Sequence, residues 1–401
     1  MAFPRALTRT LVSVAALPAL LVACSPAAEA PQATPTATSP AEVAAPNTPL
    51  SNPVPAAPVP AACGDAAAQI AAMSTRDKLA QLLMVGVSGA ADAQAVVADH
   101  HVGGIFIGSW TDKSMLNAGL SNELNSVSGP LPVAVSVDEE GGRVQRLSSL
   151  IGSQPSAKVL AQTMSPEEVY QLALQRGRAM RGLGITIDFA PVVDVTTDAD
   201  GTVIGDRSFG SDPAVVTEFA GAYARGLRHG GVLPVLKHFP GHGNSSGDSH
   251  TGAVTTPPIE ELQASDLVPY RTLTTQGPVA VMVGHMEVPG LTGADPASLS
   301  PAAYQLLRSG GYGGPPFNGP VFTDDLSGMA AISDRAGVPD AALRALQAGA
   351  DNALWLSTSE VPAVLDRLEQ AVAAGELTLP AVDASALRMA LVKGPHPRCG
   401  S

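Results

Sequence analysis

Eight short apolar runs alternate with segments of helical pattern along this chain. The runs cover residues 82–87, 104–107, 132–137, 185–195, 232–239, 279–284, 320–323 and 352–356. They are continuously apolar rather than alternating, which is typical of strands buried on both faces of a parallel sheet. Eight strands with helices between them predict an α/β fold, a single (β/α)8 barrel of the TIM type. A doubly wound open sheet is the alternative.

The segments between the runs carry helix-start signals. Ser165 and Glu168 have the spacing of a capping box, and Pro166 occupies the first helical position between them. Asp212 followed by Pro213 predicts the start of a second helix. These signals support helices between the predicted strands.

Charged and polar residues stand where four of the predicted strands end. These residues are Asp138, Lys237 with His238, His285, and Asp324 with Asp325. A buried strand that ends in charge is costly unless the charge is used or paired. Because active sites of such barrels lie at the C-terminal ends of the strands, we predict an active site there. Asp324, as the last strand residue, is expected to face the barrel mouth, and Asp325 is expected to cap the following helix.

The N-terminal sequence is typical of an exported lipoprotein. Arg5 and Arg9 precede an apolar run over residues 11–22, which is too short to span a bilayer as a helix but suits a signal peptide. The run is followed by Ala23 and then Cys24, as in a bacterial lipobox. We therefore predict a lipoprotein signal peptide over residues 1–23 and lipidation of Cys24, with an ordinary signal peptide as the alternative.

Composition then divides the chain. Residues 24–62 are rich in Ala, Pro and Thr and predict an extended tether, which leaves residues 63–401 for the barrel. The formal net charge of −13 argues against nucleic acid as a partner and against electrostatic adhesion to a membrane. The lipid on Cys24 is therefore the expected membrane contact. The expected location is the cell envelope, on the outer face of the bacterial plasma membrane. In that oxidising setting, Cys63 and Cys399 are predicted to pair, and two free thiols are the alternative.

The densest polar stretch covers residues 237–250 and allows three interpretations. His238, His242, Asp248 and His250 are all possible metal ligands. Alternatively, Asp248 and His250 form an acid–base pair, because residues two apart in an extended loop point to one side. A third interpretation is structural, with the histidines bonded to nearby backbone.

These motifs, in their order along the chain, resemble family 3 glycoside hydrolases, specifically the single-domain NagZ-type β-N-acetylglucosaminidases. The resemblance covers roughly residues 70–395 and is carried by residues 138–146, Arg207, residues 237–250 and the pair Asp324-Asp325. The chain departs from the family pattern at Glu139, so the resemblance does not say what this position beside Asp138 contacts. The lipobox and tether are similar to those of actinobacterial lipoproteins in the family.

The resemblance implies a retaining exo-β-N-acetylglucosaminidase without a cofactor. It implies that Asp324 is the nucleophile, that His250 is the general acid/base and that Asp248 polarises His250. It also implies that the sugar is held by Asp138, Arg146, Arg207, Lys237 and His238. Terminal N-acetylglucosamine on peptidoglycan fragments is the expected substrate. A β-glucosidase of the same family, a zinc-dependent hydrolase and a non-catalytic sugar-binding lipoprotein are the alternatives.

Overall fold

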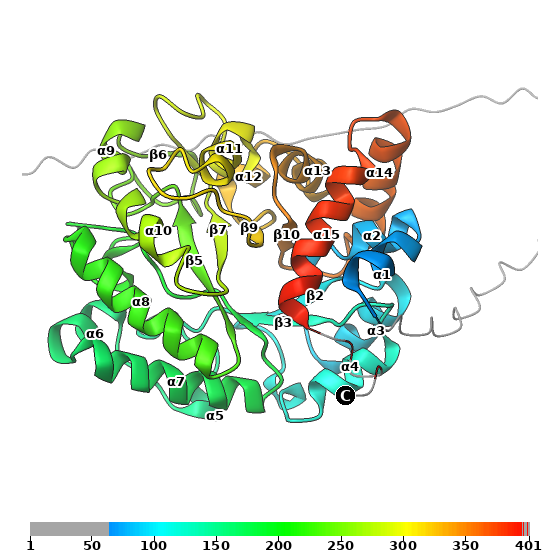
Figure 1. Ribbon diagram of the computed structural model, residues 1–401, viewed down its shortest axis with the longest axis horizontal. Coiled ribbons are helices and arrows are strands. Elements are labelled where there is room, and N and C mark those ends of the chain that lie inside the picture. The colour runs from blue at the N-terminus through cyan, green and yellow to red at the C-terminus, as the bar shows by residue number, and fades with distance from the viewer. Residues whose placement is uncertain (1–63, 395, 397–398, 400–401) are drawn as a thin grey trace, which may run out of the picture. The chain divides into compact units, whose positions relative to one another are not determined.

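Eight parallel strands close into a barrel in a computed structural model that describes residues 64–394, 396 and 399. The barrel order is β1-β10-β9-β7-β5-β4-β3-β2, which confirms the predicted (β/α)8 fold (Figure 1). The strands are β1 (Leu83–Val87), β2 (Gly104–Ile107), β3 (Ala134–Val137), β4 (Ile187–Asp188), β5 (Leu233–Phe239), β7 (Ala280–Val283), β9 (Val321–Asp325) and β10 (Asn352–Trp355).

Two strands differ from their predicted bounds. β4 is much shorter than the apolar run over residues 185–195, because Pro191 has no N–H to continue the ladder. β9 runs through Asp325, so Asp324 is not its last residue. A separate two-stranded parallel sheet, β6 (Val254–Thr255) with β8 (Met286–Glu287), has no counterpart in the sequence pattern.

Helices surround the barrel, and the two predicted helix starts are confirmed. Ser165 and Glu168 form a complete capping box at the start of α7, and Asp212 caps α8. The helices are α1 (Ala66–Ala72), α2 (Thr75–Ala80), α3 (Ala90–His100), α4 (Leu120–Val127), α5 (Ser148–Ile151), α6 (Ala157–Thr163), α7 (Pro166–Gly182), α8 (Pro213–His229), α9 (Ile259–Ala264), α10 (Leu267–Leu273), α11 (Pro301–Ser309), α12 (Ala330–Ser333), α13 (Val338–Ala348), α14 (Val361–Ala374) and α15 (Leu379–Lys393).

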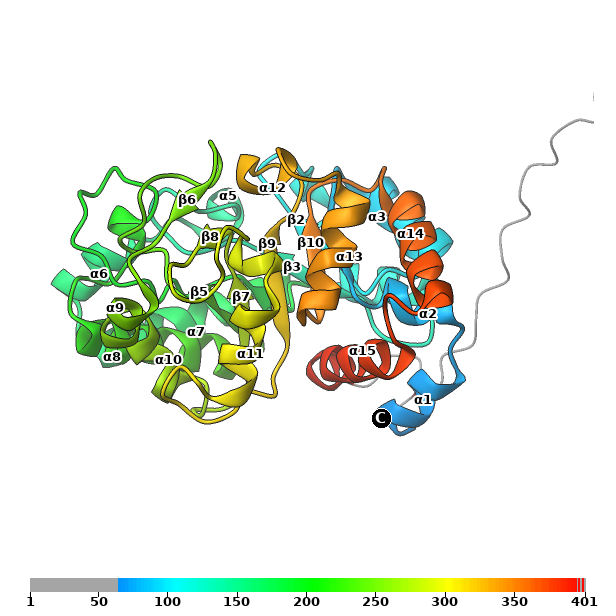
Figure 2. The same ribbon diagram turned by 90° about the horizontal axis from the view of Figure 1, so that it is seen from above.

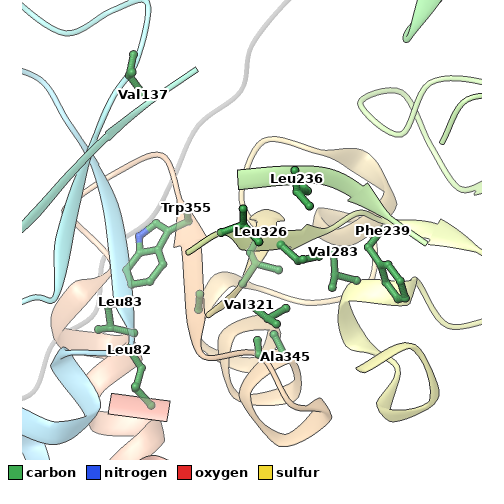
Figure 3. Close-up of a cluster of buried hydrophobic side chains, with 14 of the residues drawn as sticks. Leu82, Leu83, Val137, Leu236, Phe239, Val283, Val321, Leu326, Ala345 and Trp355 are labelled. Carbon is green, nitrogen blue, oxygen red and sulfur yellow. The ribbon is translucent and has the colours of Figure 1, made fainter. Parts of the chain in front are cut away.

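The core has two parts, one inside the barrel and one between the barrel and its helices. The interior part contains Phe106, Phe189, Phe322 and Leu354, and it includes Met389 of α15. The outer part packs strand side chains such as Trp355 and Val283 against the helices (Figure 3). Because Met389 reaches the interior cluster, α15 closes one end of the barrel, and β6 and α12 lie at the other end (Figure 2).

The predictions for the N-terminal segment fall on residues that the structure does not describe. The signal peptide, the tether, Cys24 and Cys63 all lie outside the described residues. Cys399 is disulfide-bonded, and its pairing with Cys63 stays a prediction. Within the described part of the chain, the helices are too short or too polar to cross a bilayer.

Candidate active site

One pocket at the C-terminal ends of the strands collects seven of the eight predicted catalytic and sugar-binding residues. The pocket has a volume of about 140 Å³, below the usual range for sites that enclose a whole small ligand. It is therefore too small to enclose more than one sugar unit. Its predicted lining residues are Asp138, Arg146, Arg207, Lys237, His238, His250 and Asp324, and it is completed by Glu140, Val144, Val203, His242, Ser249 and Met329.

A cluster of two cations and two carboxylates forms one wall of the pocket. Lys237 Nζ donates to Asp138 Oδ1 at 2.7 Å and to Glu140 Oε1 at 2.6 Å. The Arg207 guanidinium makes two bonds of 2.8 Å to the Glu140 carboxylate. Burial opposes charge on Glu140, but Arg207 and Lys237 outweigh it and lower its pKa. Burial likewise opposes charge on Lys237, yet Asp138 and Glu140 raise its pKa. The wall therefore holds Glu140 as an anion and Lys237 as a cation within a connected set of ion pairs.

Asp324 is held as an anion in this pocket. Burial alone would raise its pKa, but the neighbouring imidazoles of His285 and His238 and a bond of 2.9 Å from the Asp325 N–H lower it to about 2. Among the described residues, that backbone N–H is the one hydrogen-bond partner of the Asp324 carboxylate. The group thus keeps an oxygen available for attack on a substrate.

Asp325 has a different role from its neighbour, and the prediction that it caps the next helix was wrong. Its carboxylate accepts the N–H groups of Ser327 and Gly328, both at 2.8 Å, so it closes the turn before α12. The N-cap of α12 is Met329. The helix starts later than expected because this turn intervenes after β9.

Sequence reasoning missed Asp194, which organises two of the pocket histidines. Its Oδ2 lies 2.7 Å from His238 Nδ1, and its Oδ1 accepts the N–H groups of His238 and His242. Asp194 is 1% exposed, and although burial opposes its charge, His238 lowers its pKa. The available signal was an acid inside the apolar run over residues 185–195, where an unpaired charge would be costly.

A second buried acid, Asp266, lies close to Asp194. Its Oδ1 accepts the N–H groups of Val195 and Gly243, each at 3.2 Å. Burial and the neighbouring Asp194 charge raise its pKa to about 7. In the folded protein, Asp266 is therefore mainly protonated and neutral below a pH of about 7.

We predict a pH-dependent loss of stability that originates at Asp266. Its folded pKa of about 7 lies above the value of an ordinary Asp, so its stabilising contribution is fully present below the unfolded pKa and is lost as pH rises through 7. The free energy of unfolding of the wild type relative to Asp266→Asn should fall by on the order of 3 kcal/mol between pH 5 and pH 8. Urea unfolding of both proteins at several pH values measures this difference, and parallel curves would contradict it.

Asp248 and His250 form the predicted pair, but through a turn and not an extended loop. Asp248 Oδ1 lies 2.7 Å from His250 Nδ1 and also accepts the His250 N–H at 2.9 Å. Asp248 is not among the residues that line the pocket and contacts His250 from outside it. Burial opposes a charge on Asp248, but the hydrogen bonds from His250 outweigh burial and lower the pKa of Asp248. The His250 side chain is 60% exposed. Its loop is attached to α12, because Ala330 and Ala331 donate to the carbonyls of His250 and Ser249.

Glu139 points away from the pocket, which answers the question left open beside Asp138. It is fully buried, pairs with Arg176 at 2.5 Å and accepts the N–H groups of Arg146 and Leu147. It thereby shapes the turn that brings Arg146 to the pocket. Among the described residues, the Arg146 guanidinium has no hydrogen-bond or ion-pair partner, so it is free to bind substrate.

The candidate metal ligands of this loop do not converge. His238 is bonded to Asp194, and His250 is bonded to Asp248. His242 lies 2.8 Å from Ser245 Oγ, and burial and the neighbouring His238 lower its pKa to about 4. Across residues 64–394, 396 and 399, no three His, Cys, Asp or Glu side chains gather in a way that would hold a metal ion.

Comparison with known proteins places this chain in a family. The sequence matches the glycosyl hydrolase family 3 N terminal domain over residues 74–392. It is 65% identical over 402 aligned positions to a protein of Mycobacterium tuberculosis (strain ATCC 25618 / H37Rv) named beta-hexosaminidase LpqI, and the match covers 100% of both chains. A beta-hexosaminidase of Stenotrophomonas maltophilia (strain K279a) is 37% identical over 231 residues, which cover 56% of this chain and 67% of that protein.

Solved structures agree with this assignment. The structure of M. tuberculosis LpqI has a TM-score of 0.83 at 68% identity and covers 85% of this chain and 100% of its own. A family 3 glycosyl hydrolase from Mycobacterium smegmatis has a TM-score of 0.81 at 74% identity and covers 82% of this chain and 99% of its own. A β-N-acetylglucosaminidase from Paenibacillus sp. has a TM-score of 0.74 at 34% identity, covering 80% and 62%. The chain therefore belongs to glycosyl hydrolase family 3.

Proposed function

We propose that this chain is a retaining exo-β-N-acetylglucosaminidase that removes terminal, non-reducing β-linked N-acetylglucosamine through a covalent intermediate on Asp324. The observation that carries the proposal is the pairing, in one small pocket, of an ionised Asp324 with His250 and its supporting Asp248. The pocket size favours cleavage from a chain end, and relatives named beta-hexosaminidase support an N-acetylhexosamine as the sugar removed.

The first chemical step forms the covalent intermediate. The Asp324 carboxylate attacks the anomeric carbon while the glycosidic C–O bond breaks, and His250 donates its proton to the departing oxygen. The family's use of a histidine avoids a second carboxylate, whose charge would raise the pKa of the nucleophile. The ion pairs of Lys237 and Arg207 orient the acceptors and donors that hold the sugar.

The second step releases the sugar. His250, now neutral, removes a proton from water as the water oxygen attacks the anomeric carbon, and the bond to Asp324 breaks with return of the carboxylate. Asp248 stabilises the charged imidazole that exists before the first step and after the second. Two inversions at one carbon give net retention of configuration.

Paired assays test the proposed activity. The protein should hydrolyse 4-nitrophenyl N-acetyl-β-glucosaminide and leave the matching β-glucoside largely intact. The β-anomer of the product, detected by NMR early in the reaction, reports retention. Preference for the glucoside would favour the β-glucosidase alternative, and absence of turnover on both would favour a sugar-binding protein.

Peptidoglycan fragments that carry N-acetylglucosamine linked to N-acetylmuramic acid are the substrate we propose. Muramic acid bears a carboxylate, and Arg146 offers an unpaired cation at the pocket among the described residues. Mass analysis of the products from purified cell-wall fragments and from chitin oligomers, each with and without phosphate, tests this. Faster cleavage of chitin oligomers would contradict the proposed substrate, and glycosyl phosphate would identify phosphate as the acceptor.

Lipid anchoring at Cys24 to the outer face of the bacterial plasma membrane is the location we propose. The support is the apolar run over residues 11–22, followed by the small residue Ala23 and then by this cysteine. Cys24→Ala should move the protein from the membrane fraction to the soluble or secreted fraction, as judged by fractionation and immunoblotting. Cys399→Ala is the matched control and should stay with the membrane, whereas membrane retention of the Cys24 variant would contradict the proposal.

A further inference from the structure

The turn after β2 presents an exposed indole at its apex. Trp110 is 47% exposed, and it is the one Phe, Tyr or Trp side chain with more than a third of its surface exposed in the described part of the chain. One side of the ring packs on Phe106, with the ring centroids 6.1 Å apart. Phe106 belongs to the cluster that fills the barrel. Trp110 therefore continues the apolar cluster of the barrel interior to the protein surface.

Strand register places this indole at the barrel mouth. Ile107 of β2 pairs with Val137 of β3. The next residues, Gly108 and Asp138, therefore stand at one level of the mouth. A Cβ atom added to Gly108 would lie 2.4 Å from atoms of the Trp110 ring. The indole thus covers Gly108 beside the strand that delivers Asp138 to the pocket.

The turn that carries Trp110 is fixed in place by hydrogen bonds. Thr111 Oγ1 accepts the Gly108 N–H at 3.0 Å and donates to the Val87 carbonyl of β1 at 2.7 Å. The Lys113 ammonium donates to the carbonyls of Ser109 and Thr111 at 3.1 and 3.3 Å. An apolar ring held out to solvent on so well-bonded a turn loses little conformational entropy when it binds a ligand.

We infer that Trp110 is a stacking platform for the leaving-group sugar, the residue on the far side of the cleaved bond. The inference rests on the proposed function. The pocket, at about 140 Å³, is too small to enclose more than one sugar unit, so the next sugar lies outside it. Trp110 stands outside the pocket lining, on the turn that follows β2 at the same barrel mouth. The axial C–H bonds of a β-linked pyranose form a flat, weakly positive face, which complements the negative face of an indole.

Two substrates with the same terminal sugar separate this role from catalysis. Chitobiose carries a sugar as its leaving group, whereas N-acetyl-β-glucosaminyl fluoride carries none. Trp110→Ala should lower kcat/KM for chitobiose by about five- to tenfold, mainly through KM, and change kcat/KM for the fluoride by less than about twofold. Trp110→Phe should retain most of the activity on chitobiose. Gly108→Ala, which displaces the indole, should reproduce the selective loss.

Tryptophan fluorescence gives a second readout. The chain has two tryptophans, and Trp355 is fully buried, so a ligand-dependent emission change reports Trp110. In Asp324→Asn, chitobiose should shift the emission to shorter wavelength, and N-acetylglucosamine alone should not.

The outcomes are distinct. Equal losses on both substrates, or no loss on chitobiose, would overturn the role of Trp110 while leaving the proposed function intact. An equal emission shift with the monosaccharide would overturn it too. Failure of the wild type to cleave either substrate would contradict the proposed function itself.

Discussion

Asp324→Asn should lower kcat by about 10⁴-fold or more while the protein stays folded, because a neutral amide replaces the carboxylate that attacks the sugar. With its pKa held at about 2, Asp324 is ionised over the whole range in which the enzyme is assayed. The acid limb of the wild-type pH–rate profile should therefore not report this group. A 2-fluoro or 5-fluoro sugar substrate should label Asp324, and peptide mapping locates the label.

Asp325→Asn is the matched control for this prediction. Asp325 bonds the backbone of Ser327 and Gly328, so its replacement should cost on the order of 1–3 kcal/mol of stability and leave the labelling reaction in place. Thermal unfolding and labelling on the same samples separate the two effects. A label found on Asp325, or normal turnover by Asp324→Asn, would show that the nucleophile is wrongly assigned.

His250→Ala should lower turnover by about 10²–10⁴-fold on substrates with poor leaving groups, the usual range for general acid–base catalysis. The loss should shrink for aryl N-acetylglucosaminides whose phenols are strong acids, because these leaving groups need little protonation. A series of such substrates, compared between wild type and variant, measures the dependence. Equal losses across the series would mean that His250 binds substrate or shapes the loop.

Asp248→Asn provides the companion measurement. Its carboxylate lies 2.7 Å from His250 Nδ1 and favours the charged imidazole. Without that carboxylate the imidazole loses the partner that orients it and supports its charge as a proton donor, so turnover of substrates with poor leaving groups should fall more than turnover of activated aryl substrates. Equal losses on both kinds of substrate would indicate that Asp248 only fixes the turn.

The fold was predictable because the barrel strands are continuously apolar and four of the predicted strands end at charged or polar residues. Each of the eight apolar runs overlaps a strand of the barrel, and Asp138, Lys237 and Asp324 meet because parallel strands deliver their C-terminal ends to one mouth. The helix starts at Ser165 and Asp212 were also predicted correctly, since a cap needs only residues two or three positions apart, whereas the cap predicted at Asp325 was wrong.

The parts that were missed depend on partners distant in sequence. Glu140 and Glu139 are adjacent acids with similar local context, yet one faces Arg207 and Lys237 in the pocket and the other faces Arg176 in the core. Only the fold decides which acid faces the pocket. The shortness of β4 and the turn at Asp325 have a different cause. Both arise from local backbone geometry, which a pattern of apolar residues does not encode.

Closure of the barrel ties the beginning of the folded chain to its end. Leu83 of β1 pairs with Ala353 of β10, and α15 then covers the barrel base and pairs with α2 through Asp383 and Lys78. A chain that stops before β10 leaves two open sheet edges, which are templates for aggregation. Such long-range pairing also makes folding slow relative to local structure. A nonsense mutation upstream of β10 should therefore yield aggregated protein and not a shortened enzyme.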